Sequence, residues 1–164
     1  MSAPVRAFVA LGSNLGDRRA HLERALGGLA SAPGVRLAAA SAAFENPPVG
    51  GPPQDDYWNA VAEVRTTLTP HALHALLRAL EDRAGRVRAE RDGPRTLDLD
   101  LLLHGDLVRD EPGLTLPHPR LHERRFVLEP LADLDPALVV PGHGTVAELL
   151  ASLDARSARP DGQG

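Results

Sequence analysis

Two aspartates, Asp98 and Asp100, lie two residues apart inside the leucine-rich run TLDLDLLL (96–103). The run has the composition of a buried strand, yet burying an unpaired carboxylate is costly. Alternate residues of a strand face the same side, so both carboxylates point together while the leucines between them face the core. Two carboxylates on one face suit magnesium, which completes its shell with water and phosphate oxygens. The pattern predicts a metal site; the alternative is a solvated face on which arginines pair with these acids.

The basic residues favour the metal hypothesis. All 18 are arginine and none is lysine, so a bound polyanion has to be held by guanidinium groups, helix N-termini or metal. A polyphosphate would account for both features, because magnesium meets some of its oxygens and guanidinium groups meet the rest. The arginines that closely precede the aspartates are Arg86, Arg88, Arg91 and Arg95.

Two further segments contain residues that could take part in chemistry. His118 lies between two prolines in LPHPRLHERRF and is interpreted either as a structural residue or as a hydrogen-bond donor to a phosphate oxygen. The remaining six histidines carry no pattern and are expected at the surface. GSNLGDR (12–18) matches neither glycine-rich phosphate-loop pattern, so it is interpreted as a strand-to-helix turn.

Composition limits the possible classes of protein. The 164 residues fit one domain, and no apolar stretch approaches the ~20 residues of a membrane span. A net charge of −4 argues against nucleic-acid binding as the main activity. The absence of cysteine fits a cytoplasmic location.

Hydrophobic periodicity predicts an order of elements. Thr69 followed by Pro70 indicates the start of the clearest helix. The order strand, helix, strand, strand, helix, strand matches the split βαβ arrangement, so we expect a single-domain, ferredoxin-like α+β sandwich with a mostly antiparallel sheet and helices packed on its faces. The expected segments are strands at 5–11, 34–45, 57–68 and 95–105, helices at 15–31 and 69–85, and loops at 45–56 and 86–93, followed by a short strand and turns, a partly helical segment and a final short helix.

Five blocks carry a family resemblance: ALGSNLGDR, NPPVG, DYWNAV, GRVRAERDGPRTLDLDLLLHGD and LPHPRLHERRFVLEPL. In this order, across nearly the whole chain, they closely resemble the 6-hydroxymethyl-7,8-dihydropterin pyrophosphokinase family of folate biosynthesis. The resemblance implies a ferredoxin-like enzyme that transfers the β,γ-diphosphate of ATP to the pterin hydroxymethyl group and releases AMP, in tetrahydrofolate biosynthesis.

The resemblance also implies roles for individual residues. Asp98 and Asp100 match ligands of two magnesium ions that act with ATP, and Arg86 and Arg95 match groups that assist the transfer. The positions that match ATP contacts are Glu81, Arg88, Arg91, His118 and Arg124. The positions that match pterin contacts are Asn46, Pro47, Pro48, Val49, Tyr57, Asn59 and Phe126.

The residue types agree with the pterin assignment. A flat heteroaromatic ring suits an aromatic sandwich and directional amide contacts, which Tyr57, Phe126 and Asn59 supply. The chain has one tryptophan, one tyrosine and three phenylalanines, so candidates are scarce. For Phe126 the alternative is plain core packing.

Two positions depart from the family pattern. Asp92 stands where many members carry an aromatic residue, and Pro119 follows the PH histidine where an aromatic residue is common. Neither touches the metal pair, so we expect the reaction to survive with altered lid closure or ATP contact.

Two other functions share some of these sequence features. A nucleotidyltransferase also uses paired carboxylates on a strand, but it attacks the α-phosphorus and releases pyrophosphate. A ferredoxin-like RNA-binding module needs aromatic residues on its sheet and a basic face, which the net charge of −4 argues against.

The sequence also predicts the domain bounds, the cellular location and the partners. Residues 1–155 are expected to form the pyrophosphokinase domain, and 156–164 a disordered tail. We expect a cytoplasmic monomer whose partners are ATP and hydroxymethyldihydropterin, with no nucleic acid and no membrane.

Overall fold

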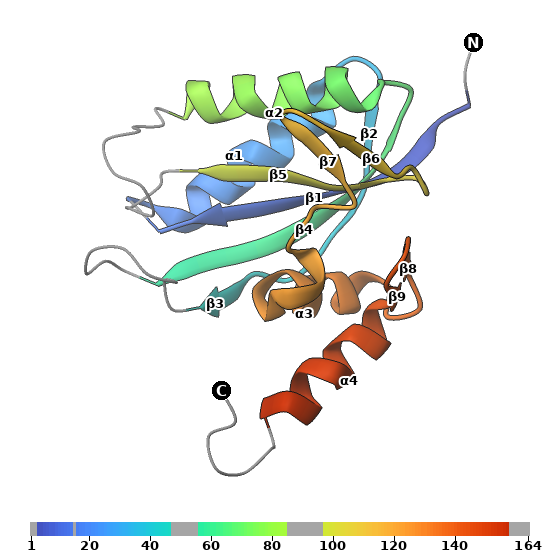
Figure 1. The fold of residues 1–164 in the computed structure, drawn as a ribbon. Coiled ribbons are helices and arrows are strands. Elements are labelled where there is room, and N and C mark those ends of the chain that lie inside the picture. The colour runs from blue at the N-terminus through green and yellow to red at the C-terminus, as the bar shows by residue number, and fades with distance from the viewer. Residues whose placement is uncertain (1–2, 15, 47–55, 85–96, 158–164) are drawn as a thin grey trace.

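An antiparallel sheet organises the computed structural model, which describes residues 3–14, 16–46, 56–84 and 97–157 (Figure 1). Its strands are β1 (Val5–Ser13), β2 (Val35–Ala40), β3 (Phe44–Asn46), β4 (Tyr57–Thr66) and β5 (Asp98–His104). The order across the sheet is β2-β4-β1-β5, with β3 pairing the first residues of β4. Neighbouring strands are antiparallel throughout.

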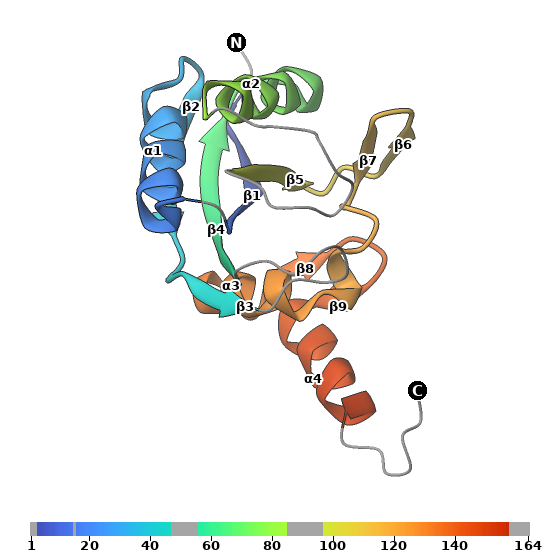
Figure 2. The same ribbon diagram turned by 90° about the vertical axis from the view of Figure 1, so that its left-hand side faces the viewer.

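Helices cover both faces of this sheet, as Figure 2 shows. The helices are α1 (Arg18–Ser31), α2 (Pro70–Arg83), the 3₁₀ turn η1 (Leu121–Glu123), α3 (Arg125–Leu134) and α4 (Val146–Ser157). Leucines of α1 and α2 form one core with alternate residues of β1, β4 and β5, whereas α3 and α4 form a second core against the opposite face. Two small hairpins complete the described fold: β6 (Arg109–Glu111) with β7 (Leu114–Leu116), and β8 (Val139–Val140) with β9 (Gly144–Thr145).

Local sequence explains where the first two helices begin and how closely they pack. The side chain of Asp17 accepts the Ala20 N–H at 3.1 Å, and Thr69 accepts the Ala72 N–H at the same distance. Both contacts satisfy donors that a helix N-terminus leaves unpaired, and the predicted start at Thr69 is confirmed. Gly28 lets α1 approach α2, because a Cβ there would lie 2.6 Å from Leu80 Cδ2.

The predicted strand at 34–45 is divided in the structure into β2 and β3. Between them, the Ser41 hydroxyl accepts the Val61 N–H at 2.9 Å and donates to the Ala42 carbonyl at 2.8 Å. A side chain thus replaces a backbone partner of β4 at this point, and the local pairing changes from β2 to β3.

The prediction that every histidine other than His118 lies at the surface is wrong for His104, which is 4% exposed. A register shift opposite Phe8 and Val9 leaves Leu102 as an extra residue in β5. A bulge of this kind reverses which face the following residues occupy, so His104 pairs with Ala7 and turns toward the α1–α2 core. There its Nε2 lies 2.9 Å from the Leu68 carbonyl oxygen.

In the part of the chain that the structure describes, no helix is long and apolar enough to cross a membrane. The final helix α4 ends at Ser157, so the first two residues of the expected tail, Arg156 and Ser157, are helical. Residues 158–164 lie outside the described part of the chain.

Candidate active site

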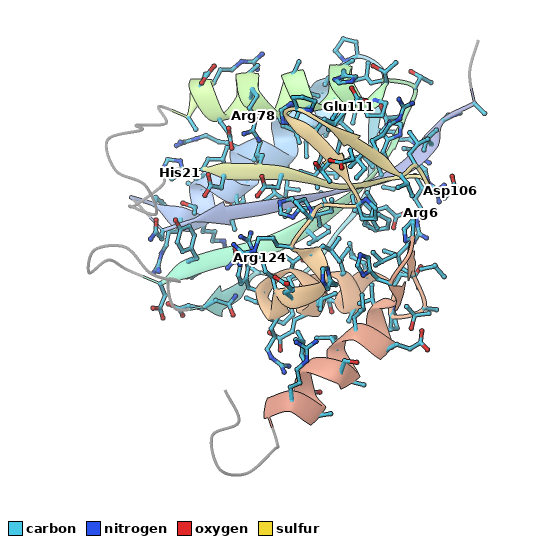
Figure 3. The ribbon with its side chains drawn as sticks, in the orientation of Figure 1. Arg6, His21, Arg78, Asp106, Glu111 and Arg124 are labelled. Carbon is cyan, nitrogen blue, oxygen red and sulfur yellow. The ribbon has the colours of Figure 1, made fainter. Side chains whose placement is uncertain are left out.

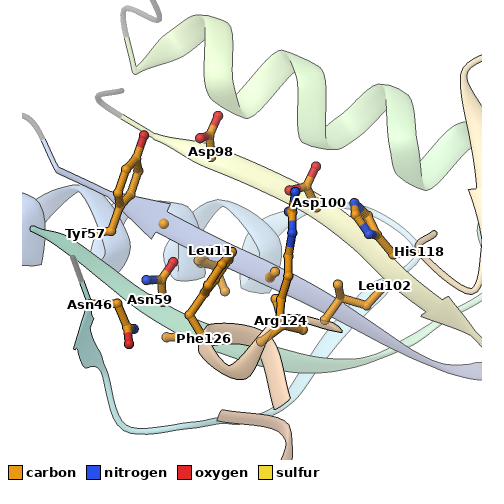
Figure 4. Close-up of a pocket in the computed structure, with 14 residues that line it drawn as sticks. Leu11, Asn46, Tyr57, Asn59, Asp98, Asp100, Leu102, His118, Arg124 and Phe126 are labelled. Atoms are coloured by element: carbon orange, nitrogen blue, oxygen red, sulfur yellow. The ribbon is translucent and has the colours of Figure 1, made fainter. Parts of the chain in front are cut away.

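One cavity of about 170 Å³ opens on the sheet face opposite α1 and α2 (Figure 4). It is bounded by β1, β4 and β5 and by the start of α3. The described residues that line it are Ala10, Leu11, Gly12, Asn46, Tyr57, Asn59, Ala60, Asp98, Asp100, Leu102, His118, Arg124, Phe126 and Val127.

The two aspartates share one wall of this cavity, as the strand pattern predicts. Asp98 pairs with Gly12 of β1 and Asp100 pairs with Ala10, and both carboxylates are half-buried. Leu99, between them, is 0% exposed and packs into the opposite core. Within the described residues no group of three or more histidine, aspartate or glutamate side chains could hold a metal ion.

A histidine and an arginine stand beside Asp100 at the same end of the cavity (Figure 4). The segment that carries His118 is anchored to the outer edge of β5, since the His118 N–H donates to the Leu102 carbonyl at 2.9 Å. His118 Nδ1 accepts the Arg120 N–H at 3.2 Å, so the ring proton of the neutral form lies on Nε2. Burial lowers the pKa of His118, and this outweighs the opposing influence of Asp100. The ring is therefore a neutral N–H donor at pH 7.

Arg124, the residue that directly precedes α3, lines the cavity. Its guanidinium carbon lies 5.4 Å from the centroid of the Phe126 ring, a cation–π distance. No carboxylate in the described part of the chain forms an ion pair with it. It thus supplies a positive charge that remains available to an anion.

Aromatic and amide side chains line the other end of the cavity. Tyr57 and Asn59 project from β4, Asn46 lies opposite Tyr57 on β3, and Phe126 lies on α3 (Figure 4). Asn59 is 9% exposed, and no protein hydrogen-bond partner of its amide is found within the described residues. A buried amide that faces a cavity is suited to a ligand with its own donors and acceptors.

Gly12 is a lining residue that the sequence analysis missed, because its motif was interpreted only as a turn. A Cβ at this position would lie 3.0 Å from Asn59 Oδ1 and 3.6 Å from Tyr57 Cδ1. Glycine therefore leaves the space that the Asn59 amide needs, whereas the distance to Tyr57 is an ordinary contact. The signal was present in ALGSN, where a glycine ends an apolar strand directly before polar residues.

Glu81 occupies a different place from the other described candidates. It is 1% exposed on α2 and is not among the described residues that line the cavity. Its carboxylate accepts the Leu99 N–H at 2.8 Å and pairs with Arg78 at 3.1 Å.

The structure thus brings eight of the predicted site residues together: Asn46, Tyr57, Asn59, Asp98, Asp100, His118, Arg124 and Phe126. The predicted residues that lie outside the described part of the chain are Pro47, Pro48, Val49, Arg86, Arg88, Arg91 and Arg95. Their roles stay predictions.

Comparison with known families and proteins gives consistent matches. Residues 8–136 match the family model described as 7,8-dihydro-6-hydroxymethylpterin-pyrophosphokinase (HPPK). A 2-amino-4-hydroxy-6-hydroxymethyldihydropteridine pyrophosphokinase of Methylorubrum extorquens is 47% identical over 150 residues, covering 91% of this chain and 94% of that protein. The protein of the same name from Pseudomonas aeruginosa is 45% identical over 147 residues, covering 90% of this chain and 91% of its own.

Solved structures share the fold. The crystal structure of a Plasmodium falciparum HPPK-DHPS triple mutant with SDX-DHP has a TM-score of 0.73 at 14% identity, covering 93% of this chain and 45% of that one. An HPPK-DHPS structure in complex with substrates has a TM-score of 0.74 at 10% identity, covering 94% and 44%. This chain therefore spans less than half of those longer proteins, and the likeness concerns the fold alone.

Proposed function

The chain belongs to the 7,8-dihydro-6-hydroxymethylpterin-pyrophosphokinase family, and from this premise we propose that its cavity binds both substrates of one transfer. The enzyme transfers the β,γ-diphosphate of ATP to the hydroxymethyl group of 6-hydroxymethyl-7,8-dihydropterin and releases AMP, a step of folate biosynthesis. The observation that carries the proposal is that an aromatic and amide end and a charged end share one cavity.

The aromatic and amide end suits the pterin. Tyr57 and Phe126 offer ring faces for a flat heteroaromatic ring, and Asn59 offers an amide that can both donate and accept. Asn46 adds a second amide at the rim, with its Nδ2 donating to the Phe44 carbonyl at 3.3 Å. A ring held here would lie in the same cavity as the two aspartates.

The charged end of the cavity offers two carboxylate ligands, which suit magnesium when a nucleotide supplies further oxygens. Two carboxylates are the number that magnesium commonly takes from a protein, with phosphate and water oxygens completing the octahedron. Asp98 and Asp100 would hold it, and we propose two ions. When bound, the metal would neutralise charge on the triphosphate and favour in-line transfer.

The chain's own side chains would contribute separately from the metal. His118 would donate its Nε2 proton to a nucleotide oxygen as a neutral group, and Arg124 would meet a phosphate oxygen with a permanent charge. We propose that Arg88, Arg91 and Glu81 also contact the nucleotide. Arg86 and Arg95 would assist the transfer. No described side chain in the cavity needs to act as a general base, because stabilising the charge of the phosphoryl groups is the main catalytic task.

The sheet supports the proposed fold class. The order β2-β4-β1-β5, with helices after β1 and β4, agrees with the split βαβ arrangement of ferredoxin-like proteins. We further propose a cytoplasmic monomer that binds no nucleic acid, which the net charge of −4 supports.

Product analysis tests the proposed reaction. The protein is incubated with ATP, magnesium and hydroxymethyldihydropterin, and the nucleotide product is identified by chromatography. We expect AMP; pyrophosphate would instead indicate nucleotidyl transfer and would reject the proposal. Asp98→Asn should reduce AMP formation by about 100-fold or more, as the loss of one group that stabilises transferred charge typically does. Asp106→Asn, at an exposed aspartate beyond the end of β5, is the matched control and should retain activity.

A further inference from the structure

An ion pair from α2 closes the outer edge of β5 directly behind the aspartates. Arg78 Nη1 lies 3.1 Å from Glu81 Oε1, and Glu81 Oε2 accepts the Leu99 N–H at 2.8 Å. Arg78 Nη2 donates to the Leu99 carbonyl oxygen, which completes a closed ring of contacts. Figure 3 shows Arg78 between α2 and β5.

The position of Leu99 in an edge strand explains why its backbone groups bind side chains. β5 is an edge strand, and Leu99 lies opposite Leu11 of β1. Both backbone polar groups of Leu99 point away from β1, where a further strand would otherwise bind them. The Arg78–Glu81 pair takes the place of that strand at a single residue.

The carboxylate of Glu81 is buried, and several contacts fix its position. The Glu81 side chain is 2% exposed, so its charge has to be compensated by a cation and by hydrogen bonds. Charge-assisted hydrogen bonds are shorter and stronger than neutral ones. At the same time the Leu99 side chain, 0% exposed, is held in the core shared with α1 and α2. Backbone and side chain of this one residue are thus both anchored.

Fixing Leu99 orients its two neighbours. Successive strand residues point to opposite faces, so with Leu99 held toward the core, Asp98 and Asp100 are directed into the cavity. Their backbone groups face β1, whose Gly12 and Ala10 they pair with. The separation and direction of the two carboxylates therefore depend on an anchor on each side of β5.

We propose that Arg78 and Glu81 are positioning residues that hold the carboxylates of Asp98 and Asp100 at the spacing that a divalent cation and a triphosphate require. The inference rests on the proposed function of the aspartates. It gives Glu81 a role through Leu99 that is additional to the ATP contact implied by the family resemblance.

Manganese binding measures the positioning directly. Mn²⁺ is titrated by electron paramagnetic resonance in the presence of α,β-methylene-ATP, which does not turn over. Glu81→Gln keeps the size of the side chain but removes the negative charge with which Arg78 pairs. We expect Mn²⁺ affinity and kcat to fall about 10- to 100-fold, the usual effect of losing a group that orients a metal ligand, while the KM for the pterin stays unchanged. Asp82→Asn, an exposed neighbour on α2, is the matched control and should bind Mn²⁺ as the wild type does.

A second variant separates positioning from packing. Arg78→Met combined with Glu81→Met replaces the ion pair by apolar side chains, an exchange that buried pairs commonly tolerate. We expect this double variant to fold cooperatively yet to keep the weakened Mn²⁺ affinity, since neither methionine can bind the Leu99 N–H or carbonyl.

Two results would overturn the inference. One is Mn²⁺ affinity within twofold of wild type in Glu81→Gln; the other is recovery of both thermal stability and Mn²⁺ affinity in the double methionine variant. Failure of the proposed function looks different, because the wild type itself would then release no AMP. The comparison of Mn²⁺ affinity between wild type and variants would still decide the positioning role.

Discussion

Replacing Gly12 by alanine tests whether Asn59 contacts the pterin. Gly12 has no positive φ angle, so its backbone accepts alanine, but the new Cβ would lie 3.0 Å from Asn59 Oδ1. A carbon–oxygen contact settles at about 3.3–3.6 Å, so the amide has to retreat by roughly 0.3–0.6 Å. The same Cβ would lie 3.6 Å from Tyr57 Cδ1, an ordinary contact, so the tyrosine ring can stay in place.

The magnitude follows from the hydrogen bond that the retreat weakens. A hydrogen bond of about 2.9 Å stretched by this amount loses most of its value, and one such bond contributes about 0.5–1.5 kcal/mol. The expected result is a dissociation constant for the pterin about 2- to 10-fold higher than in the wild type. Binding of the ATP analogue should not change, because Asp100, His118 and Arg124 lie at the other end of the cavity.

Calorimetric titration with each ligand separates these outcomes. The pterin is titrated in the presence of α,β-methylene-ATP, and the analogue is titrated alone. Gly27→Ala is the matched control, because a Cβ there meets nothing within 4 Å. Unchanged pterin affinity in Gly12→Ala would refute the contact to Asn59, and an equal loss for both ligands would indicate a general distortion of β1 instead.

Three further predictions concern stability. Gly27→Ala should stabilise the fold by about 0.5–1 kcal/mol in chemical denaturation, because its Cβ meets nothing within 4 Å. Gly28→Ala should be less stable than Gly27→Ala, because its Cβ would lie 2.6 Å from Leu80 Cδ2 and the leucine side chain has to move; the opposite order would contradict the packing of α1 on α2. Burial lowers the pKa of His118 from its ordinary value of 6.5, so the unfolded chain binds more protons and stability falls as the pH drops through 6.5 toward the folded-state pKa. His118→Asn should therefore lose less stability than wild type between about pH 7.5 and pH 5.5, and equal losses in denaturation curves would reject this account. Thr145→Ala should lower stability by about 1 kcal/mol in thermal unfolding, since the Thr145 hydroxyl accepts an N–H of the first turn of α4, and an unchanged melting temperature would exclude that cap.

Much of the architecture was predictable because it depends on neighbours along the chain. Apolar spacing and the Thr69 cap located α2, and alternation located β4 and β5. The division of 34–45 into two strands was not predictable, because the Ser41 hydroxyl meets Val61 of another strand. The burial of His104 was not predictable for a related reason. A bulge that forms only when β5 pairs with β1 changes the sheet face on which His104 lies.

The site residues also differ in whether local sequence was enough to predict them. Asp98 and Asp100 were predictable as a pair, because two positions along one strand share a face whatever the rest of the chain does. Tyr57, Asn59 and Phe126 became pterin candidates only through their residue types and the family resemblance. Neither spacing nor composition shows that they line the cavity of the aspartates, since that depends on how β4 and α3 pack against the sheet.

The sequence by itself determined the helices, the paired carboxylates and the family, because periodicity, caps and motifs are properties of residues close together in the chain. Only the tertiary structure decided that an aromatic end and a charged end form one cavity, that Gly12 leaves room for Asn59, and that Arg78 and Glu81 close the ring behind Leu99. Those contacts join elements whose relative position follows from strand register and helix packing. Neither register nor packing is encoded in any short stretch of the chain.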